Sequence, residues 1–226
     1  MRILTLLLSL ILSFPFVLSA QSVGDLLHKV SAALVEGKDD YAISLFRQAV
    51  SLGADQPEMF YWTHVDKTST VAPRLAQELA AYYKRERNYD KAYLFYKELL
   101  QYYPNKVTVL VPCAEMEMMR GKDKDAVELY TKALKLDPNN LQANIFLGNY
   151  YYLQAEQDKK ILDDEYHRIT SPTRMQYARY RNGLADIFST NYTKAKMYLL
   201  KVLQLFPSTE AGNTLEKIKA VEMALK

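Results

Sequence analysis

The sequence predicts an all-α fold in which pairs of helices stack at a constant spacing. Only seven of the 226 residues are glycine, and scarce glycine with abundant Leu, Ala, Lys and Glu favours helices over a turn-rich β fold. Pro104, Pro138 and Pro172 follow one another at intervals of 34 residues. The segments NYDKA (88–92) and NYTKA (191–195) each have a proline twelve residues after their alanine. The chain therefore repeats one helix start and one helix stop.

The first twenty residues, MRILTLLLSLILSFPFVLSA, differ in character from the rest of the chain. Arg2 precedes an apolar run without acidic residues, and the run ends in the small residues Ser19 and Ala20. This layout predicts a secretory signal peptide that is cleaved near Ala20. The alternative is an uncleaved membrane anchor, which the short run and Pro15 disfavour. We expect an exported protein of the periplasm or cell envelope, with no membrane span after cleavage.

Four segments share one helical pattern. An alanine is followed four residues later by an aromatic residue or leucine, then by an apolar residue after three more, and by proline after five more. Steps of four and three keep side chains on one helix face. The alanine lets a neighbouring helix approach, and proline marks the boundary to the next helix. The instances are Ala92–Tyr96–Leu99–Pro104, Ala126–Tyr130–Ala133–Pro138, Ala195–Leu199–Val202–Pro207 and the weaker Ala42–Phe46–Ala49–Ala54.

A second pattern precedes these helices, so each unit is predicted to be two antiparallel helices joined by a short turn. Leu147, Gly148 and Tyr151 share one side of a helix that starts after Pro138. The corresponding positions hold Leu79, Ala80 and Tyr83 in one copy, and Cys113, Ala114 and Glu117 in another. Gly37 and Gly121 are expected at turns. Pro112 falls inside a predicted helix, where we expect a kink.

These residues resemble the tetratricopeptide repeat (TPR) family, specifically a bacterial exported TPR protein. The 34-residue period, the Leu-Gly-x-x-Tyr of the first helix and the Ala-x-x-x-aromatic…Pro of the second carry the resemblance. It covers residues 23–54, 73–154 and 192–207, and the family tryptophan is replaced by Ala76, Leu110 and Asn144. It implies one TPR-like α-solenoid domain, 21–226, with units at 23–54, 73–106, 107–140 and 141–207.

The regular spacing fails in two places. Residues 55–72 predict a short helix followed by a loop, with Phe60, Tyr61 and Trp62 packed between the first and second repeat units. In residues 155–190, Lys160 and Asp164 occupy the expected alanine and aromatic positions. No Gly or Pro occurs from 149 to 171, which predicts one long helix, 141–169. It would pair with a helix at 172–188, bend at 189–191 and continue into 192–206.

The predicted hairpin, 155–190, is thus inserted inside the fourth unit. The alternative is a degenerate fifth repeat. The insertion places Gly148 near Ala195, whereas a fifth repeat places it near Lys160. The residues 208–226, with Ser208 as helix cap, predict a C-terminal capping helix, which repeat arrays need for solubility.

The family resemblance implies a groove lined by first helices, where a protein or peptide partner would bind. Hairpin tyrosines are a second candidate surface, because a protrusion has less core to fill. The net charge of +3 is weak, so nucleic acid is not expected. The groove residues are Arg74, Gln77, Lys84, Thr108, Val111, Glu115, Met118, Gln142, Ile145, Asn149 and Tyr152, and the hairpin residues are Tyr166, Tyr177 and Tyr180.

The sequence contains no constellation that predicts catalysis, a metal or a cofactor. The segment DDEYH (163–167) supplies a carboxylate and a histidine on one helix face, which is too few ligands for a metal. Cys113, the only cysteine, is expected to be buried. We therefore expect a non-catalytic interaction scaffold or accessory factor of the bacterial cell envelope. The alternatives are a glycan-binding envelope protein and an enzyme with an acidic site near residues 163–167.

Overall fold

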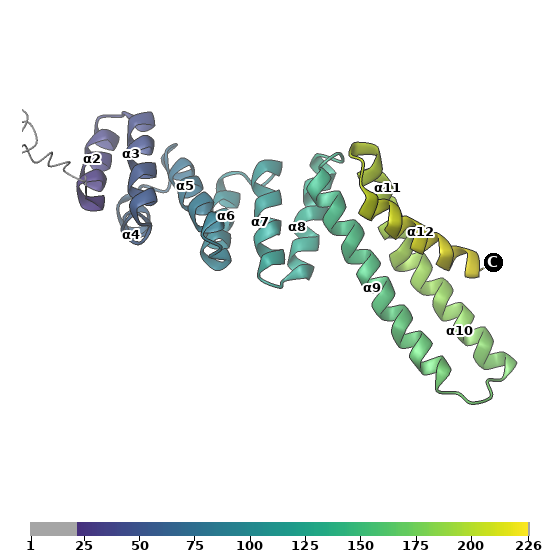
Figure 1. Cartoon of the computed structure of the whole chain (residues 1–226). Helices are drawn as coiled ribbons and strands as arrows, with labels where there is room; N and C mark the ends of the chain where they lie inside the picture. The colour runs from purple at the N-terminus through teal and green to yellow at the C-terminus, as the bar shows by residue number, and fades with distance from the viewer. Residues whose placement is uncertain (1–21, 226) are drawn as a thin grey trace, which may run out of the picture. The chain divides into compact units, whose positions relative to one another are not determined.

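The computed structural model describes residues 22–225, in which helices are joined by short turns and no strand occurs (Figure 1). The predicted signal peptide, residues 1–20, lies outside the described residues. The chain divides into two compact units whose boundary follows Leu79. This boundary falls inside helix α5 (Ala72–Arg85), which contributes residues to both units. None of the described helices has the length and apolar character needed to cross a membrane.

The first unit contains the predicted helix pair and the predicted short helix. α2 (Val23–Val35) and α3 (Asp39–Leu52) pack on each other and on α4 (Asp55–His64). Ser22 begins α2 with a capping box, in which its hydroxyl accepts from the backbone N–H of Asp25, satisfying a helix donor that would otherwise be unpaired. Tyr61 is fully buried, but Trp62 is 40% exposed. Trp62 is therefore less buried than a place between the first two repeat units would suggest, although its ring lies 5.0 Å from that of Tyr61.

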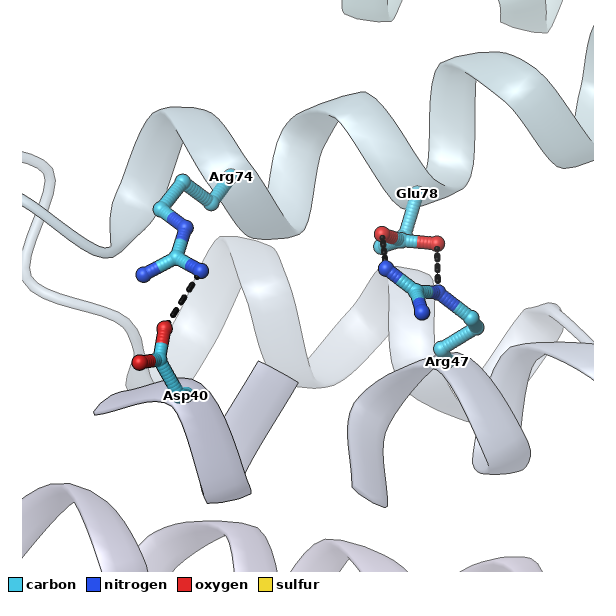
Figure 2. A network of polar contacts seen from close by, with 4 residues as sticks. All are labelled: Asp40, Arg47, Arg74 and Glu78. Atoms are coloured by element: carbon cyan, nitrogen blue, oxygen red, sulfur yellow. Dashed lines mark hydrogen bonds and ion pairs between the residues drawn. The ribbon is translucent and has the colours of Figure 1, made fainter. Parts of the chain in front are cut away.

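Ion pairs in the first unit join residues about one repeat apart (Figure 2). Arg74 of α5 contacts Asp40 of α3 at 2.6 Å. Arg47 of α3 grips Glu78 of α5 with two hydrogen bonds, of 2.8 and 2.6 Å. Fork-to-fork pairing of guanidinium and carboxylate fixes direction as well as distance. The polar residues on the surface of α3 thus align it with α5.

The second unit begins with the repeats that the sequence pattern marks most clearly. It contains α6 (Tyr89–Tyr102), α7 (Val107–Met119), α8 (Asp123–Leu136) and α9 (Leu141–His167), each packed on the next. The alanines and tyrosines of the repeating pattern are buried, and Tyr130 is fully covered. α7 continues through Pro112, so this proline does not end the helix. The predicted α-solenoid of TPR-like helix pairs is confirmed.

The turns between paired helices share one backbone conformation. Gly37 has φ +69° and Gly121 has φ +72°, and Arg87 has φ +59°. These angles lie in the left-handed region, where glycine is favoured because a Cβ atom is crowded. Arg87 precedes Gly121 by 34 residues, so it occupies the same place in the preceding repeat. Arginine at this turn is a strained choice.

The long predicted hairpin is confirmed, and α9 forms its first arm. α9 runs for 27 residues and pairs with α10 (Arg174–Ile187), as Figure 1 shows. A Cβ atom on Gly183 would lie 3.0 Å from a methyl of Leu162, so the glycine permits close packing of the arms. A Cβ atom on Gly148 would lie 2.8 Å from Leu199. Gly148 thus faces the helix that begins beside Ala195, which excludes the degenerate fifth repeat.

A π-helical segment, η1 (Phe188–Tyr192), occupies the predicted bend and leads into α11 (Thr193–Leu205). The fully buried Tyr192 donates its hydroxyl proton to Glu156 of α9 at 2.6 Å. Asn191 donates to Asp158 of α9 at 3.0 Å. The wider turn of a π-helix is a local irregularity, and here it carries two side chains that bond to the hairpin's first arm.

The predicted capping helix is α12 (Thr209–Ala224), and it packs on α11. Ser208 caps the start of α12, and Ile218 on its inner face is fully buried. Arg181 of α10 donates to the backbone carbonyls of Ala224 and Leu225 at 2.7 and 2.6 Å. These carbonyls lack partners within the helix. The hairpin is therefore bonded to the end of the chain.

Candidate functional site

The predicted groove residues fall into both units. Arg74 and Gln77 belong to the first unit and are exposed. Arg74 forms an ion pair with Asp40 (Figure 2), and this contact helps to align α3 with α5. The other nine groove residues belong to the second unit. There, Thr108 is exposed, whereas Val111 lies in the core between α7, α8 and α9 and is only 7% exposed.

Three groove residues form a chain of hydrogen bonds along successive first helices. Lys84 Nζ of α5 donates to Glu115 Oε2 of α7 at 2.6 Å. Gln142 Nε2 of α9 donates to the same oxygen at 3.1 Å and lies 3.3 Å from the hydroxyl oxygen of Tyr130. Because Lys84 neutralises Glu115, this part of the surface presents little net charge. These hydrogen bonds hold the Gln142 side chain in place.

An apolar pocket opens beside this chain of bonds, and we call it the α9 pocket. Its volume is about 360 Å³. Phe146 stacks between Tyr130 and Tyr150, with ring centres 4.6 and 6.0 Å away, and the three rings form one wall. The exposed side chains of Ile145 and Leu153 flank the opening. The lining residues are Met118, Asp123, Tyr130, Gln142, Ile145, Phe146, Asn149, Tyr150 and Leu153.

The α9 pocket brings together four of the predicted groove residues, Met118, Gln142, Ile145 and Asn149. The sequence argument missed its aromatic wall and Leu153. A signal for them was present, because Phe146 and Tyr150 are spaced by four residues and therefore share a helix face. Leu153 extends the stripe of Ile145 and Asn149 by one further turn. The predicted Tyr152 instead turns toward the buried Tyr192, 6.2 Å away.

The chemistry of the α9 pocket is that of a binding surface. Burial raises the pKa of Tyr130 to about 12, so the phenol stays protonated at neutral pH. The exposed amide of Asn149 can donate and accept hydrogen bonds, and Gln142 Oε1 can accept them, since Gln142 Nε2 is already bonded to Glu115 and Tyr130. The only acidic lining residue is Asp123, which lies at the start of α8. The pocket offers apolar walls with a few orienting polar groups, as ligand sites generally do.

The hairpin tyrosines do not form one exposed surface. Tyr166 stacks on Tyr180 with ring centres 4.5 Å apart, and Tyr180 donates its hydroxyl proton to Asp163 at 2.8 Å. Tyr177 is 51% exposed. Two of the three predicted residues therefore hold the arms together, and Tyr177 is the one that faces solvent most openly.

The acidic segment 163–167 is occupied by contacts within the hairpin. Asp163 also accepts from Lys159 at 2.7 Å, and His167 Nδ1 lies 2.7 Å from the backbone oxygen of Asp163. Across the described residues, 22–225, no three His, Cys, Asp or Glu side chains converge as metal ligands would. Burial raises the pKa of the Cys113 thiol to about 12, so at neutral pH it is not the thiolate that nucleophilic chemistry requires.

Comparison with known proteins relates the chain first to a solved structure from Bacteroides ovatus, whose name suggests that it binds protein. The two are 56% identical, with a TM-score of 0.82, over 91% of this chain and 100% of that one. No family model matches the sequence.

Two further solved structures share 15% identity with the chain. They are the C-terminal part of a TPR repeat-containing protein of Cytophaga hutchinsonii and a thermophilic TPR protein of Thermus thermophilus. The first has a TM-score of 0.36 and covers 87% of this chain and 74% of that one. The second has a TM-score of 0.33 and covers 89% and 100%. At 56% identity over its whole length, the Bacteroides ovatus protein is a homologue, and this chain belongs to the same family.

Proposed function

We propose that this chain is a non-catalytic scaffold that binds a protein or peptide partner through the α9 pocket. The observation that carries the proposal is the pocket itself, where four predicted groove residues meet an aromatic wall that sequence reasoning had not supplied. Its volume of about 360 Å³ is at the lower end for ligand pockets, about 300–1,000 Å³. Such a volume suits a large apolar side chain from a partner.

The arrangement around the pocket suits a peptide more than a free metabolite. Ile145 and Leu153 are 41% and 63% exposed, and apolar side chains beside a pocket are typical of interaction surfaces. The amide of Asn149 and the oxygen Oε1 of Gln142 match the donors and acceptors of a peptide backbone. The suggested protein-binding role of the Bacteroides ovatus homologue agrees with this assignment.

We assign the scaffold to the bacterial cell envelope, as an exported accessory factor. The support is the signal-peptide pattern of residues 1–20. The hairpin supplies a second surface for a partner through Tyr177 and Met175, which is 75% exposed. Tyr166 and Tyr180 position this surface by stacking, and we expect them to affect binding only through the stability of the hairpin.

Peptide selection tests the pocket. Peptides displayed on phage are selected against the wild-type chain, and their affinities are measured by titration calorimetry. Ile145→Glu places a charge beside the pocket and should weaken binding by about tenfold or more. Ile161→Glu is the matched control, because Ile161 lies on the same helix and is 52% exposed but lies outside the pocket. Equal loss in both variants, or in neither, would contradict the assignment.

Expression of the full chain in a Gram-negative host tests its destination. Osmotic release of the periplasm should yield a chain whose intact mass corresponds to a start near Gln21. A full-length chain that remains in the cytoplasm would remove the envelope assignment. That outcome would leave the pocket untouched, since the peptide titration is independent of cell compartment.

A further inference from the structure

The surface formed by α11 and α12 leaves a second groove open, away from the α9 pocket. Its volume is about 540 Å³, and it lies over the cap of the repeat array. Leu200 and Leu203 of α11 remain 45% and 38% exposed, and Met223 of α12 is 59% exposed. Thus α12 covers one face of α11 and leaves apolar side chains on another. The lining residues are Lys196, Leu200, Leu203, Gly212, Leu215, Glu216, Lys219, Glu222 and Met223.

Four of these residues form one straight stripe along α12. Gly212, Glu216, Lys219 and Met223 follow one another at steps of four, three and four, so they share a helix face. The ends of the stripe are about 16 Å apart at 1.5 Å per residue. The buried Ile218 lies on a different face of the helix, which packs into the core. The stripe therefore points outward.

The stripe is complementary to the same stripe on a second copy of α12 that runs in the opposite direction. Along the helix, the midpoint of Gly212 and Met223 lies between residues 217 and 218. Glu216 and Lys219 have the same midpoint. When two copies of α12 pack antiparallel about a twofold axis at that point, Met223 of one copy faces Gly212 of the other. Glu216 then faces Lys219. Each residue meets its opposite in shape or charge, which is the condition for a twofold interface.

The details of the groove fit this pairing. A Cβ atom built on Gly212 meets no atom within 4 Å, so the glycine leaves an open notch on the surface. The exposed Met223 is a flexible apolar side chain able to fill such a space. Glu216 and Lys219 are 3.7 Å apart within one helix, with side chains 75% and 60% exposed. A pair this loose can exchange partners across an interface at little cost.

We propose that this chain forms a homodimer through antiparallel packing of α12 on α12 of a second copy, with Leu200 and Leu203 flanking the contact. The balance of charges on the groove favours a second copy over another protein. Lys196 pairs with Glu222 at 2.7 Å, and Glu216 lies 3.7 Å from Lys219 at the middle of the stripe. The groove thus carries two charges of each sign, and the central Glu216 and Lys219 are related by the twofold axis, so a second copy presents the complementary charges.

Charge reversal and charge exchange test the pairing. The oligomeric state of the purified chain is measured by sedimentation equilibrium. Lys219→Glu should weaken the dimer by about tenfold or more, because Glu216 of one copy then faces a glutamate of the other on both sides of the twofold axis. Glu216→Lys should do the same. The double variant E216K/K219E restores opposite charges across the axis and should dimerise as the wild type does. Lys217→Glu, an equal charge change on another face of α12, should have no effect.

Gly212→Ala separates loss of the dimer from loss of the fold. Because the added methyl meets no atom of the same chain, it should not disturb the monomer, and alanine favours the helix. The methyl narrows the notch for Met223, so the dimer should weaken while the melting temperature of the monomer rises.

Three outcomes would overturn the proposal. One is a wild-type chain that remains monomeric at about 100 µM, well above the dissociation constants of specific dimers; the groove would then belong to a different occupant. Another is a dimer that tolerates Lys219→Glu, which would place the interface elsewhere. The third is a double variant that stays monomeric, which would exclude the proposed antiparallel alignment.

Discussion

Gly148 provides a sharp test of how α9 meets α11. It lies inside α9, and a Cβ atom at this position would be 2.8 Å from Leu199 Cδ2 and 2.9 Å from Leu199 Cγ. Carbon atoms in contact are normally separated by about 3.5–4.0 Å. Leu199 is only 2% exposed, so its side chain has little space into which to move. Gly148→Ala should therefore strain the packing of these two helices.

Two opposing effects determine the magnitude. Alanine in place of glycine inside a helix stabilises the fold by about 1 kcal/mol. Forcing an extra methyl into a packed core costs about 1–3 kcal/mol. The clash involves Cγ as well as a terminal methyl, so rotation about the Cβ–Cγ bond of Leu199 alone does not relieve it. We expect Gly148→Ala to lower the free energy of unfolding by about 1 kcal/mol.

Two other helical glycines serve as controls. At Gly183 the nearest atoms are methyls of Leu162 at 3.0 and 3.1 Å, and Leu162 is only partly buried. Leu162 can shift, so the stabilisation of the helix by alanine and the cost of the added methyl should nearly cancel. At Gly212 the added methyl meets nothing within 4 Å. Gly212→Ala should stabilise the monomer by about 1 kcal/mol.

Urea unfolding followed by circular dichroism measures all three variants, at concentrations where the chain is monomeric. The expected order of stability is Gly212→Ala, then Gly183→Ala, then Gly148→Ala. If Gly148→Ala proved as stable as Gly212→Ala, α9 and α11 would not approach as described. The placement of the hairpin inside the fourth repeat would then lose its main support.

Three further predictions concern the turns and the hairpin. Arg87→Gly should raise the free energy of unfolding in urea by about 1 kcal/mol, because glycine relieves the left-handed strain; a loss of stability would refute the equivalence with Gly121. Arg181→Ala should speed hydrogen exchange at the end of α12, since two backbone carbonyls lose their donor; unchanged exchange would contradict this role. Partial burial opposes ionisation of Asp163, but hydrogen bonds, first from Lys159, outweigh it and lower its pKa. The folded pKa is thus below the unfolded value of about 4, so this contribution to hairpin stability is present above pH 4 and is lost as pH falls through the folded pKa. Asp163→Asn should flatten thermal unfolding against pH in that range, and an unaltered profile would count against the contact.

The helices were predictable because their pattern depends on short steps along the chain. The long α9 was expected at 141–169 and runs from Leu141 to His167. Its length followed from the absence of Gly and Pro, and its separation from a fifth repeat followed from Lys160 and Asp164 at positions that need apolar residues. These are local facts about which side chains a packed face accepts, and they need no coordinates.

Only part of the α9 pocket was predictable, because how deeply a side chain is buried depends on several helices together. The family resemblance identified Ile145 and Asn149 as facing the groove. It also selected Val111, which has the right spacing but is buried between α7 and its neighbours. Trp62 shows the opposite case, since an aromatic residue expected to pack between the first two repeat units is 40% exposed. Periodicity assigns a residue to a face of its own helix and cannot tell what covers that face.

The continuity of α9 has a mechanical consequence. Ile145 stands at the binding pocket and Tyr166 near the far turn of the hairpin, about 30 Å away along a single helix. The only glycine between Ile145 and Tyr166 is Gly148, which is packed against Leu199, and no proline occurs there, so this stretch of α9 has no built-in hinge. We therefore expect a protein bound at the turn of the hairpin to displace the part of α9 that forms the wall of the pocket. If the α9 pocket binds a peptide as proposed, a partner bound at the turn is therefore expected to alter peptide affinity through this one helix.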